Sequence, residues 1–404
     1  MTVSQRVSAG CILACSVGCG AKVVFEEPSA GGAGGSSSVT TSSSSAGGAA
    51  EGGSIAGTVP GCEVLEWAGD PILLNDGPLT GQITMAPLAN GDVALVYQIH
   101  DAGQARVLST TLGAPFDAWP PATTPPNRHA DNANSFVTVS VRPDGLFTLD
   151  GDAQGLYRLG VDGAVGDLPG SGTLWLETTG DGAFWMPTVF DPPMQVFHTE
   201  NAESPALLDY VGDVFPSGCG RFELCDSPTG VVLSFVSPPY CQNVQGVGTA
   251  ELFALTAFDP PQSVLQLELP FFPVKSRVLP RPGAYWLGVV GDGTDGARVY
   301  PLGGSGELTG DPHIETSVGD DWWPHDVATW RNGYALDYRS QNGVALGVTN
   351  GTQKTVAPLL DAELTASDSD APMLSGGPAE RSVLVAFSTL SGVLVARADC
   401  VTPL

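Results

Sequence analysis

The chain has 404 residues, among them 52 Gly and 33 Pro, and a formal net charge of −27. Gly and Pro at this density exclude a mainly helical protein, because both destabilise the interior of a helix. Hydrophobic residues make up 42% of the chain, which is enough for a large core and excludes global disorder. With 43 acidic and only 16 basic residues, the composition argues against nucleic acid as a partner, since phosphate backbones are bound through Lys and Arg.

Residues 1–19 predict an export signal. Arg6 is the one positive charge there, and a short run of apolar and small residues from Val7 to Val17 follows it without a carboxylate. A transmembrane helix needs about 20 apolar residues, so this run is too short to span a bilayer. A short apolar run behind a positive charge is typical of a secretory signal.

Small residues precede a cysteine at the end of this run, in Ser16-Val17-Gly18-Cys19. The segment resembles the lipobox of bacterial lipoproteins, which implies that Cys19 is lipid-modified. Gly20 follows the cysteine in place of Asp, and by the same resemblance this implies sorting to the outer membrane of a Gram-negative bacterium. Two alternatives stay open: lipidation at Cys15, and a plain cleaved signal without lipid.

Residues 20–58 predict a flexible tether. From residue 29 onward, all but Val39, Glu51 and Ile55 are Gly, Ser, Ala or Thr, which bury too little apolar surface to offset the entropy of ordering. A coil of this length has an end-to-end distance of roughly 35 Å. A cysteine followed by a Gly/Ser/Thr-rich stretch resembles the lipoproteins of myxobacteria, which implies a domain attached to a membrane through a lipid.

A repeated unit occupies residues 59–404. Each unit has a short strand, a turn, a strand of about seven residues, a second turn and a further strand, which is the pattern of consecutive hairpins. Spacings of about 48 residues fit one four-stranded propeller blade with its loops. Seven units predict an all-β, seven-bladed β-propeller; six or eight blades, a pair of β-sandwiches and an irregular β-solenoid stay open. The turn glycines are Gly91, Gly145, Gly182, Gly230, Gly283 and Gly333, and the last unit has Glu380-Arg381 at this position.

Ring closure gives an independent expectation. A propeller pairs its first and last strands so that no edge is left open. The strand at 62–67 is then expected beside the strand at 392–400, antiparallel to it, which brings Cys62 opposite Cys400. We therefore predict a Cys62–Cys400 disulfide that closes the ring.

The remaining cysteines indicate an oxidising compartment, but they cannot all form disulfides with one another. With Cys19 lipidated, an odd number is left. The strands around the turn at 227–230 bring Cys219 nearest to Cys241, which predicts a second disulfide and leaves Cys225 unpaired. Lipidation at Cys15 would make the count even.

The sequence contains no HExxH, GxSxG, Walker, dinucleotide-binding or EF-hand motif. In a propeller, the loops after the second strands share one face with the loops between blades, and that face is the expected site of function. Second-strand loops place on this face His100, Asp101, Asp150, Asp152, Asp191, Asp292 and Asp295. The connections between blades supply the candidate ligand-binding residues, which are His129, Asp131, Asp311, His313, Asp321, Trp322, Trp323, His325 and Asp326.

These residues predict an acidic and aromatic surface that could hold a cation or stack a sugar on a tryptophan. Trp322 and Trp323 have an alternative role as a plug in the core between blades, and isolated aspartates are common in turns. The pairs Asp311/His313 and His325/Asp326 would each orient an imidazole as a general base if the protein were an enzyme. The segment 291–296 resembles a calcium loop but lacks the downstream bidentate Glu of an EF-hand. No cofactor is expected, and calcium stays open as an alternative.

The sequence therefore predicts a monomeric, lipid-anchored propeller of the cell envelope that binds or scaffolds a protein or a glycan. A secreted hydrolase or lyase that uses loop carboxylates and histidines on a polysaccharide is the alternative. A subunit of an envelope assembly, recognisable by a large apolar patch, is a third possibility.

Overall fold

The computed structural model describes residues 58–401 with gaps, the longest of which are 132–145, 200–208, 239–247 and 363–372. The predicted signal, the lipid site at Cys19 and all but the last residue of the tether lie outside the described residues. The regular structure described is strand, apart from one 3₁₀ turn at Gly293–Asp295. Within the described ranges, no helix has the length and apolarity needed to cross a bilayer.

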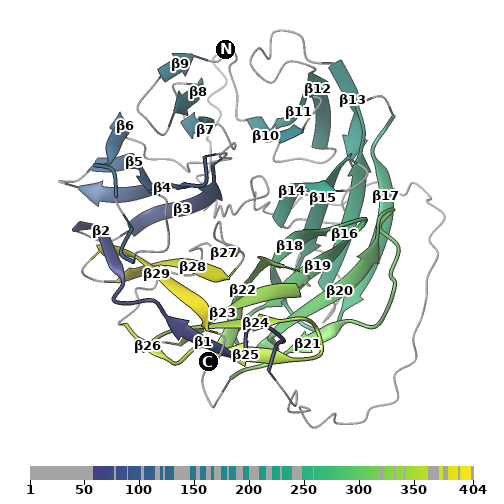
Figure 1. The fold of residues 1–404 in the computed structure, drawn as a ribbon. Helices are drawn as coiled ribbons and strands as arrows, with labels where there is room; N and C mark the ends of the chain where they lie inside the picture. Colours follow the sequence, from purple (N-terminus) through teal and green to yellow (C-terminus); the bar gives the residue numbers. More distant parts are fainter. Residues whose placement is uncertain are drawn as a thin grey trace, which may run out of the picture.

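The described strands form seven antiparallel sheets, which Figure 1 shows arranged around a central axis. This confirms the predicted β-propeller. The first four sheets contain β3 (Leu79–Pro87), β4 (Val93–Asp101), β5 (Gln104–Leu112) and β6 (Asn127–Asp131); β7 (Leu146–Gly151), β8 (Gly155–Gly160) and β9 (Val165–Asp167); β10 (Leu174–Thr179), β11 (Gly182–Pro187), β12 (Met194–Thr199) and β13 (Asp209–Val214); and β14 (Arg221–Ser227), β15 (Gly230–Ser237), β16 (Gly248–Leu255) and β17 (Gln262–Leu269).

The last three sheets contain β18 (Pro273–Arg281), β19 (Ala284–Gly291), β20 (Ala297–Gly303) and β21 (His313–Glu315); β22 (Trp323–Trp330), β23 (Gly333–Ser340), β24 (Gly343–Thr349), β25 (Lys354–Val356) and β26 (Leu360–Asp361); and β27 (Met373–Ser375), β28 (Ser382–Thr389) and β29 (Gly392–Val401), joined by β1 (Val64–Trp67) and β2 (Ile72–Asp76).

The core lies between neighbouring sheets. One cluster joins Leu287 of β19 to Val232 of β15, and another joins the seventh sheet to the first through Leu384 and Leu95. Every side chain of β28 is buried. Strands packed on both faces favour continuous runs of Val and Leu over strict alternation, because neither face meets water. The apolar runs in the sequence have this origin.

Antiparallel strand order gives the sheets two distinct ends. We call one end the closure side: there the first strand of a sheet turns into the second and the third connects to the fourth. At Gly283, in such a turn, φ is +69° and a Cβ would meet nothing, so the backbone conformation itself favours glycine. We call the opposite end the loop side: there the second strand connects to the third and one sheet connects to the next.

The ring closes between the predicted strands and through the predicted disulfide, but the predicted register, with Cys62 opposite Cys400, is wrong. β1 and β2 both pair with β29, with Leu65 opposite Cys400 and Ile72 opposite Val395. Cys62 and Cys400 form a disulfide, with their Cα atoms 4.7 Å apart. The third strand of the seventh sheet ends near Cys400, so the disulfide lies on the closure side.

The expectation for Cys225 is wrong. This residue is disulfide-bonded, and its partner lies outside the described residues. Cys225 lies on β14 and is fully buried in the core between the fourth and fifth sheets. Cys219 and Cys241 also lie outside the described residues, so their pairing stays a prediction.

Candidate functional site

The segment 311–326 does not lie on one face, contrary to the sequence prediction. It contains a complete strand, β21, followed by the connection that leads into β22. Asp311 and His313 therefore lie on the closure side, where the third strand connects to the fourth. Trp322 and Trp323 lie on the loop side, where one sheet leads into the next. A strand of three residues carries too little pattern to be recognised in the sequence.

The other predicted ligand residues are dispersed. His129 belongs to β6, the outer strand of the first sheet, and not to a connection between sheets; its Nε2 lies 2.6 Å from Ser109 Oγ. Asp131 ends the same strand, and its side chain is not described. Asp321 lies outside the described residues. Ligand binding by these residues stays a prediction.

Trp322 and Trp323 precede and begin the innermost strand β22, and both are half-buried. Trp322 packs against the core cluster between the fifth and sixth sheets, which favours the plug among the two roles expected for it. Its carbonyl accepts a hydrogen bond of 2.8 Å from Val318 N, which fixes the connection that precedes the strand.

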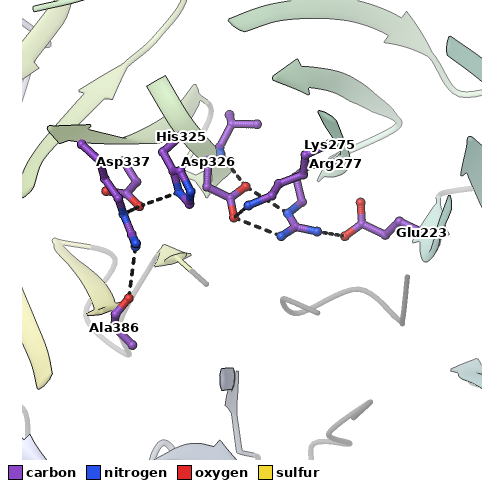
Figure 2. A network of polar contacts seen from close by, with 9 residues as sticks. Glu223, Lys275, Arg277, His325, Asp326, Asp337 and Ala386 are labelled. Atoms are coloured by element: carbon purple, nitrogen blue, oxygen red, sulfur yellow. Dashed lines mark hydrogen bonds and ion pairs between the residues drawn. The ribbon is translucent and has the colours of Figure 1, made fainter. Parts of the chain in front are cut away.

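Asp326 is the centre of a buried charge network on the innermost strands (Figure 2). Arg277 of β18 donates two hydrogen bonds to its carboxylate, from Nε at 3.1 Å and from Nη2 at 3.0 Å. Lys275 Nζ adds a contact of 3.2 Å to the same carboxylate, and Val327 N donates at 2.8 Å. Arg277 Nη1 also reaches Glu223 Oε1 on β14 at 3.0 Å. The network therefore links the fourth, fifth and sixth sheets near their loop-side ends.

All four charged groups of this network are at most 3% exposed as side chains. Burial by itself would raise the pKa of Asp326, but Arg277 and Lys275 outweigh it and hold the pKa well below its ordinary range. The carboxylate is therefore ionised at every physiological pH. The idealised cost of burying such charges is repaid only when geometry and hydrogen bonds are good, as they are here.

A second branch, also drawn in Figure 2, begins at His325. Its Nδ1 lies 3.5 Å from Asp337 Oδ2 on β23, and Arg339 Nε donates to the same oxygen at 2.8 Å. Arg339 Nη2 continues to the carbonyl of Ala386 on β28, at 3.3 Å. Burial, with the charges of Arg339 and Lys275, lowers the pKa of His325 to about 4. The imidazole is neutral at pH 7.

The expected His325/Asp326 pair is therefore not formed. His325 occupies a break in the register between β22 and β23, and Asp326 is directed to Arg277 and Lys275. An aspartate held by two cations has no free lone pair directed to an imidazole or a substrate. The inner-strand charges stabilise the packing of sheets, and they do not form a general acid–base pair.

His313 belongs to another cluster, on the closure side between the fifth and sixth sheets. Its Nδ1 lies 3.3 Å from the hydroxyl of Tyr334, which donates to Glu315 Oε1 at 2.6 Å. Lys354 Nζ lies 2.5 Å from Glu315 Oε2 and 3.1 Å from the hydroxyl of Tyr338. Asp311, the partner that the sequence predicted, is exposed two residues earlier, and a deeper glutamate takes its place.

The calcium-like segment 291–296 has a structural role. Asp295 Oδ2 accepts a hydrogen bond of 3.0 Å from Phe272 N, and Asp292 N donates to Phe272 O at 2.8 Å. These bonds join the second-strand loop to the connection that enters the fifth sheet. Among the described residues, no group of three or more His, Cys, Asp or Glu side chains is arranged to hold a metal ion.

Sequence reasoning missed Glu223, Lys275, Arg277, Asp337 and Arg339. A signal for three members of the network was present: Glu223, Arg277 and Asp326 each precede the turn glycine of their unit by six or seven residues. A charge at the same place in three consecutive apolar strands indicates a contact from blade to blade. Asp337 and Arg339 follow the turn glycine, and their partners are decided by packing alone.

No family model and no curated protein matches the chain. Solved structures similar to it include a puromycin-hydrolyzing peptidase of Mycobacterium tuberculosis, 14% identical over 86% of this chain and 55% of that one, with a TM-score of 0.47. A second similar structure comes from work on two prolyl endopeptidases. It is 16% identical over 82% of this chain and 46% of that one, with a TM-score of 0.45. The chain thus spans about half the length of these peptidases.

A third structure, the GH93 alpha-L-arabinofuranosidase of Fusarium graminearum with arabinobiose, is 8% identical over 81% of this chain and 97% of that one, with a TM-score of 0.44. Identities and TM-scores this low carry no conclusion about activity. The chain is a β-propeller with seven described sheets, closed by a disulfide between Cys62, just before the first strand, and Cys400 on the last.

Proposed function

We propose that this protein is a lipid-anchored binding module of the cell envelope, attached through Cys19 to the outer membrane and presenting a propeller face to a glycan or a protein. The observation that carries the proposal is the position of the chain entry. Residues 58–62 enter the ring on the closure side, and the loop side lies at the other end of the sheets. A tether attached there leaves the loop side accessible.

The entry is firmly held. Thr355 Oγ1 donates to the carbonyl of Cys62 at 2.6 Å and accepts from Val59 N at 3.0 Å. Arg331 Nη1 reaches the carbonyl of Gly61 at 3.4 Å, and the disulfide fixes Cys62 to the last strand. A pulling force on the tether, or its thermal motion, therefore acts on a fixed point of the ring and does not detach the first strand.

A rigid frame supports the loop side. The inner-strand network holds three neighbouring sheets together with charges that are fully buried. Binding loops carried by a rigid scaffold lose little conformational entropy when a ligand binds. The half-buried Trp323 at the start of β22 lies on this side and is the described residue that we assign to the binding surface.

The full-length protein, extracted from membranes, tests this proposal. Intact mass identifies the acyl group on Cys19, or shows a plain cleaved signal and overturns the anchor. Titration with neutral and acidic polysaccharides, read by tryptophan fluorescence, then compares wild type with Trp323→Ala. We expect binding that the substitution weakens at least tenfold, while Leu308→Ala, which alters a 42% exposed side chain on the closure side, has no effect.

The same samples are assayed for reducing ends and for unsaturated uronate products. Turnover of a bound polysaccharide would replace the binding module with the hydrolase or lyase of the alternative hypothesis. Unchanged binding by Trp323→Ala would remove this part of the loop side from the proposed surface.

A further inference from the structure

Arg281 is a cation without a described anionic partner. It ends β18 on the closure side, and its guanidinium lies over the indole of Trp286, 4.1 Å from the ring centroid. Within the described ranges, its side chain makes no hydrogen bond or ion pair. Partial burial lowers the pKa of Arg281, which is the direction expected for a cation held away from water. In a chain of net charge −27, a half-buried guanidinium without a carboxylate is unusual.

His313 flanks the same indole from another strand. Its ring lies 5.7 Å from Trp286 in an edge-to-face arrangement, and Arg281 contributes to lowering the pKa of His313 after burial itself. Glu315 acts in the opposite direction and does not cancel burial. The imidazole is therefore neutral at pH 7, next to a guanidinium that pairs with none of the described carboxylates.

The hydrogen-bond chain fixes the position of the imidazole proton. The single hydrogen of the Tyr334 hydroxyl is donated to Glu315, so this oxygen can only accept from His313. The proton of His313 must then be on Nδ1, and Nε2 keeps its lone pair. Lys354 neutralises the charge of Glu315. The carboxylate therefore fixes the direction of the hydrogen bonds from His313 to Tyr334 and from Tyr334 to Glu315 without making the imidazole cationic.

Gly351 gives the site its shape. It lies in the turn between β24 and β25 with φ of +92°, and a Cβ there would approach His313 Cε1 to 2.1 Å, Nδ1 to 2.6 Å and Nε2 to 3.1 Å. The backbone thus lies against this edge of the ring, where any side chain would collide with it. The ring is half-buried, and none of the described contacts engages its Nε2.

We propose that Arg281 and His313 form a second binding site, on the closure side, for a carboxylate with a neighbouring hydroxyl group. The guanidinium binds the carboxylate through paired N–H donors, and His313 Nε2 accepts a hydrogen bond from the hydroxyl. Uronates and small 2-hydroxy acids share this chemistry. The site is at the opposite end of the sheets from the proposed loop-side surface and does not depend on it.

Calorimetric titration of the full chain at pH 7 tests the site with D-galacturonate, lactate, D-galactose and acetate as probes. We expect galacturonate or lactate to bind, and galactose and acetate to bind at least tenfold more weakly, because each lacks one of the two groups. The stronger of the first two probes identifies whether the sugar ring is recognised. Binding of neither at millimolar concentrations would overturn the proposal.

Arg281→Gln and His313→Gln should each weaken binding at least tenfold, with near-UV circular dichroism confirming the fold. Arg331→Gln is the matched control, because Arg331 also stacks on a tryptophan, Trp330, at 4.6 Å on the same side. Equal affinity in wild type and Arg281→Gln would overturn the site. In wild type, long-range ¹H–¹⁵N spectra should show His313 protonated at Nδ1; protonation at Nε2 would contradict the proposed acceptor.

Discussion

Two groups of buried charges at opposite ends of the sheets show two different uses of charge. On the loop side, the carboxylate of Asp326 is shared by Arg277 and Lys275, and Arg277 also has Glu223. On the closure side, Lys354 pairs with Glu315, whereas Arg281 contacts an aromatic ring and no carboxylate among the residues that the structure describes. The first group is balanced within the fold. The second has one cation more than its described anions.

Balance has an energetic consequence. Removing one member of a buried pair leaves its partner desolvated and uncompensated, which costs several kcal/mol. Removing a cation that has no ion-pair partner costs only its packing and its contact with the ring. Stability measurements can therefore separate charges that hold the ring together from a charge that is available to a ligand.

The largest effect is expected from Asp326→Asn. Arg277 and Lys275 would lose their shared carboxylate while remaining buried, and unfolding free energy should fall by about 3–5 kcal/mol. Urea denaturation followed by circular dichroism measures this change. Asp311→Asn, at an exposed position, is the control and should change stability by less than about 0.5 kcal/mol. Equal stabilities of the two variants would show that the network is not what joins the sheets.

The pH dependence of stability tests the second branch of the network. His325 has a folded-state pKa of about 4, below the ordinary value of 6.5, so the unfolded chain takes up a proton first as the pH falls. The contribution of His325 to the free energy of unfolding is on the order of 3 kcal/mol. It is fully present above pH 6.5 and is lost between pH 6.5 and 4.

His325→Gln should flatten the loss of stability over this range, because glutamine does not titrate. Denaturation at pH 7, 5.5 and 4.5 measures the slope. Asp326, with its depressed pKa, contributes stability that is lost only below about pH 4. A slope unchanged in His325→Gln would mean that the pKa of His325 is the same in the folded and the unfolded chain.

A moderate effect is expected from Glu315→Gln. Lys354 would lose its anion but keep the hydroxyl of Tyr338, and its side chain is 14% exposed, so water can assist it. The loss should be about 1–3 kcal/mol, the range for a buried polar group left with fewer partners. A loss as large as that of Asp326→Asn would show that the closure-side cluster is as tightly balanced as the inner network.

The smallest effect distinguishes the two regions most sharply. Arg281→Gln should cost no more than about 1 kcal/mol, because it removes a cation–π contact and no described ion pair. Thermal unfolding in the absence of ligand measures it against Asp326→Asn. A loss above about 3 kcal/mol would show that Arg281 has a structural anion, which would argue against an available cation.

Much of the architecture was predictable from the spacing of turns. A unit of about 48 residues predicted four-stranded blades. The antiparallel alignment of 62–67 with 392–400 predicted the Cys62–Cys400 disulfide, although in the structure Leu65 lies opposite Cys400. These features depend on local chain conformation and on the requirement that a ring leave no open edge. The prediction for Cys225 failed because turn positions alone do not tell which faces of neighbouring strands carry the thiols.

The candidate site was less predictable. His313 and His325 are twelve residues apart, yet the three-residue strand that begins at His313 places them at opposite ends of the sheets. Each also found a partner that was not its neighbour in sequence: Tyr334 for His313 and Asp337 for His325. Side chains next to each other along a strand are poorly placed to meet. Asp337 lies on the strand paired with that of His325, whereas Tyr334 lies on the sheet packed against that of His313.

The sequence by itself determined that the chain forms hairpins of fixed length and repeats them until the ends meet, because turn glycines and apolar runs act locally. Only the tertiary structure decided which charges face one another, since Glu223, Arg277 and Asp326 come from three different sheets. Their contact depends on the packing distance between blades, and no stretch of sequence contains that distance.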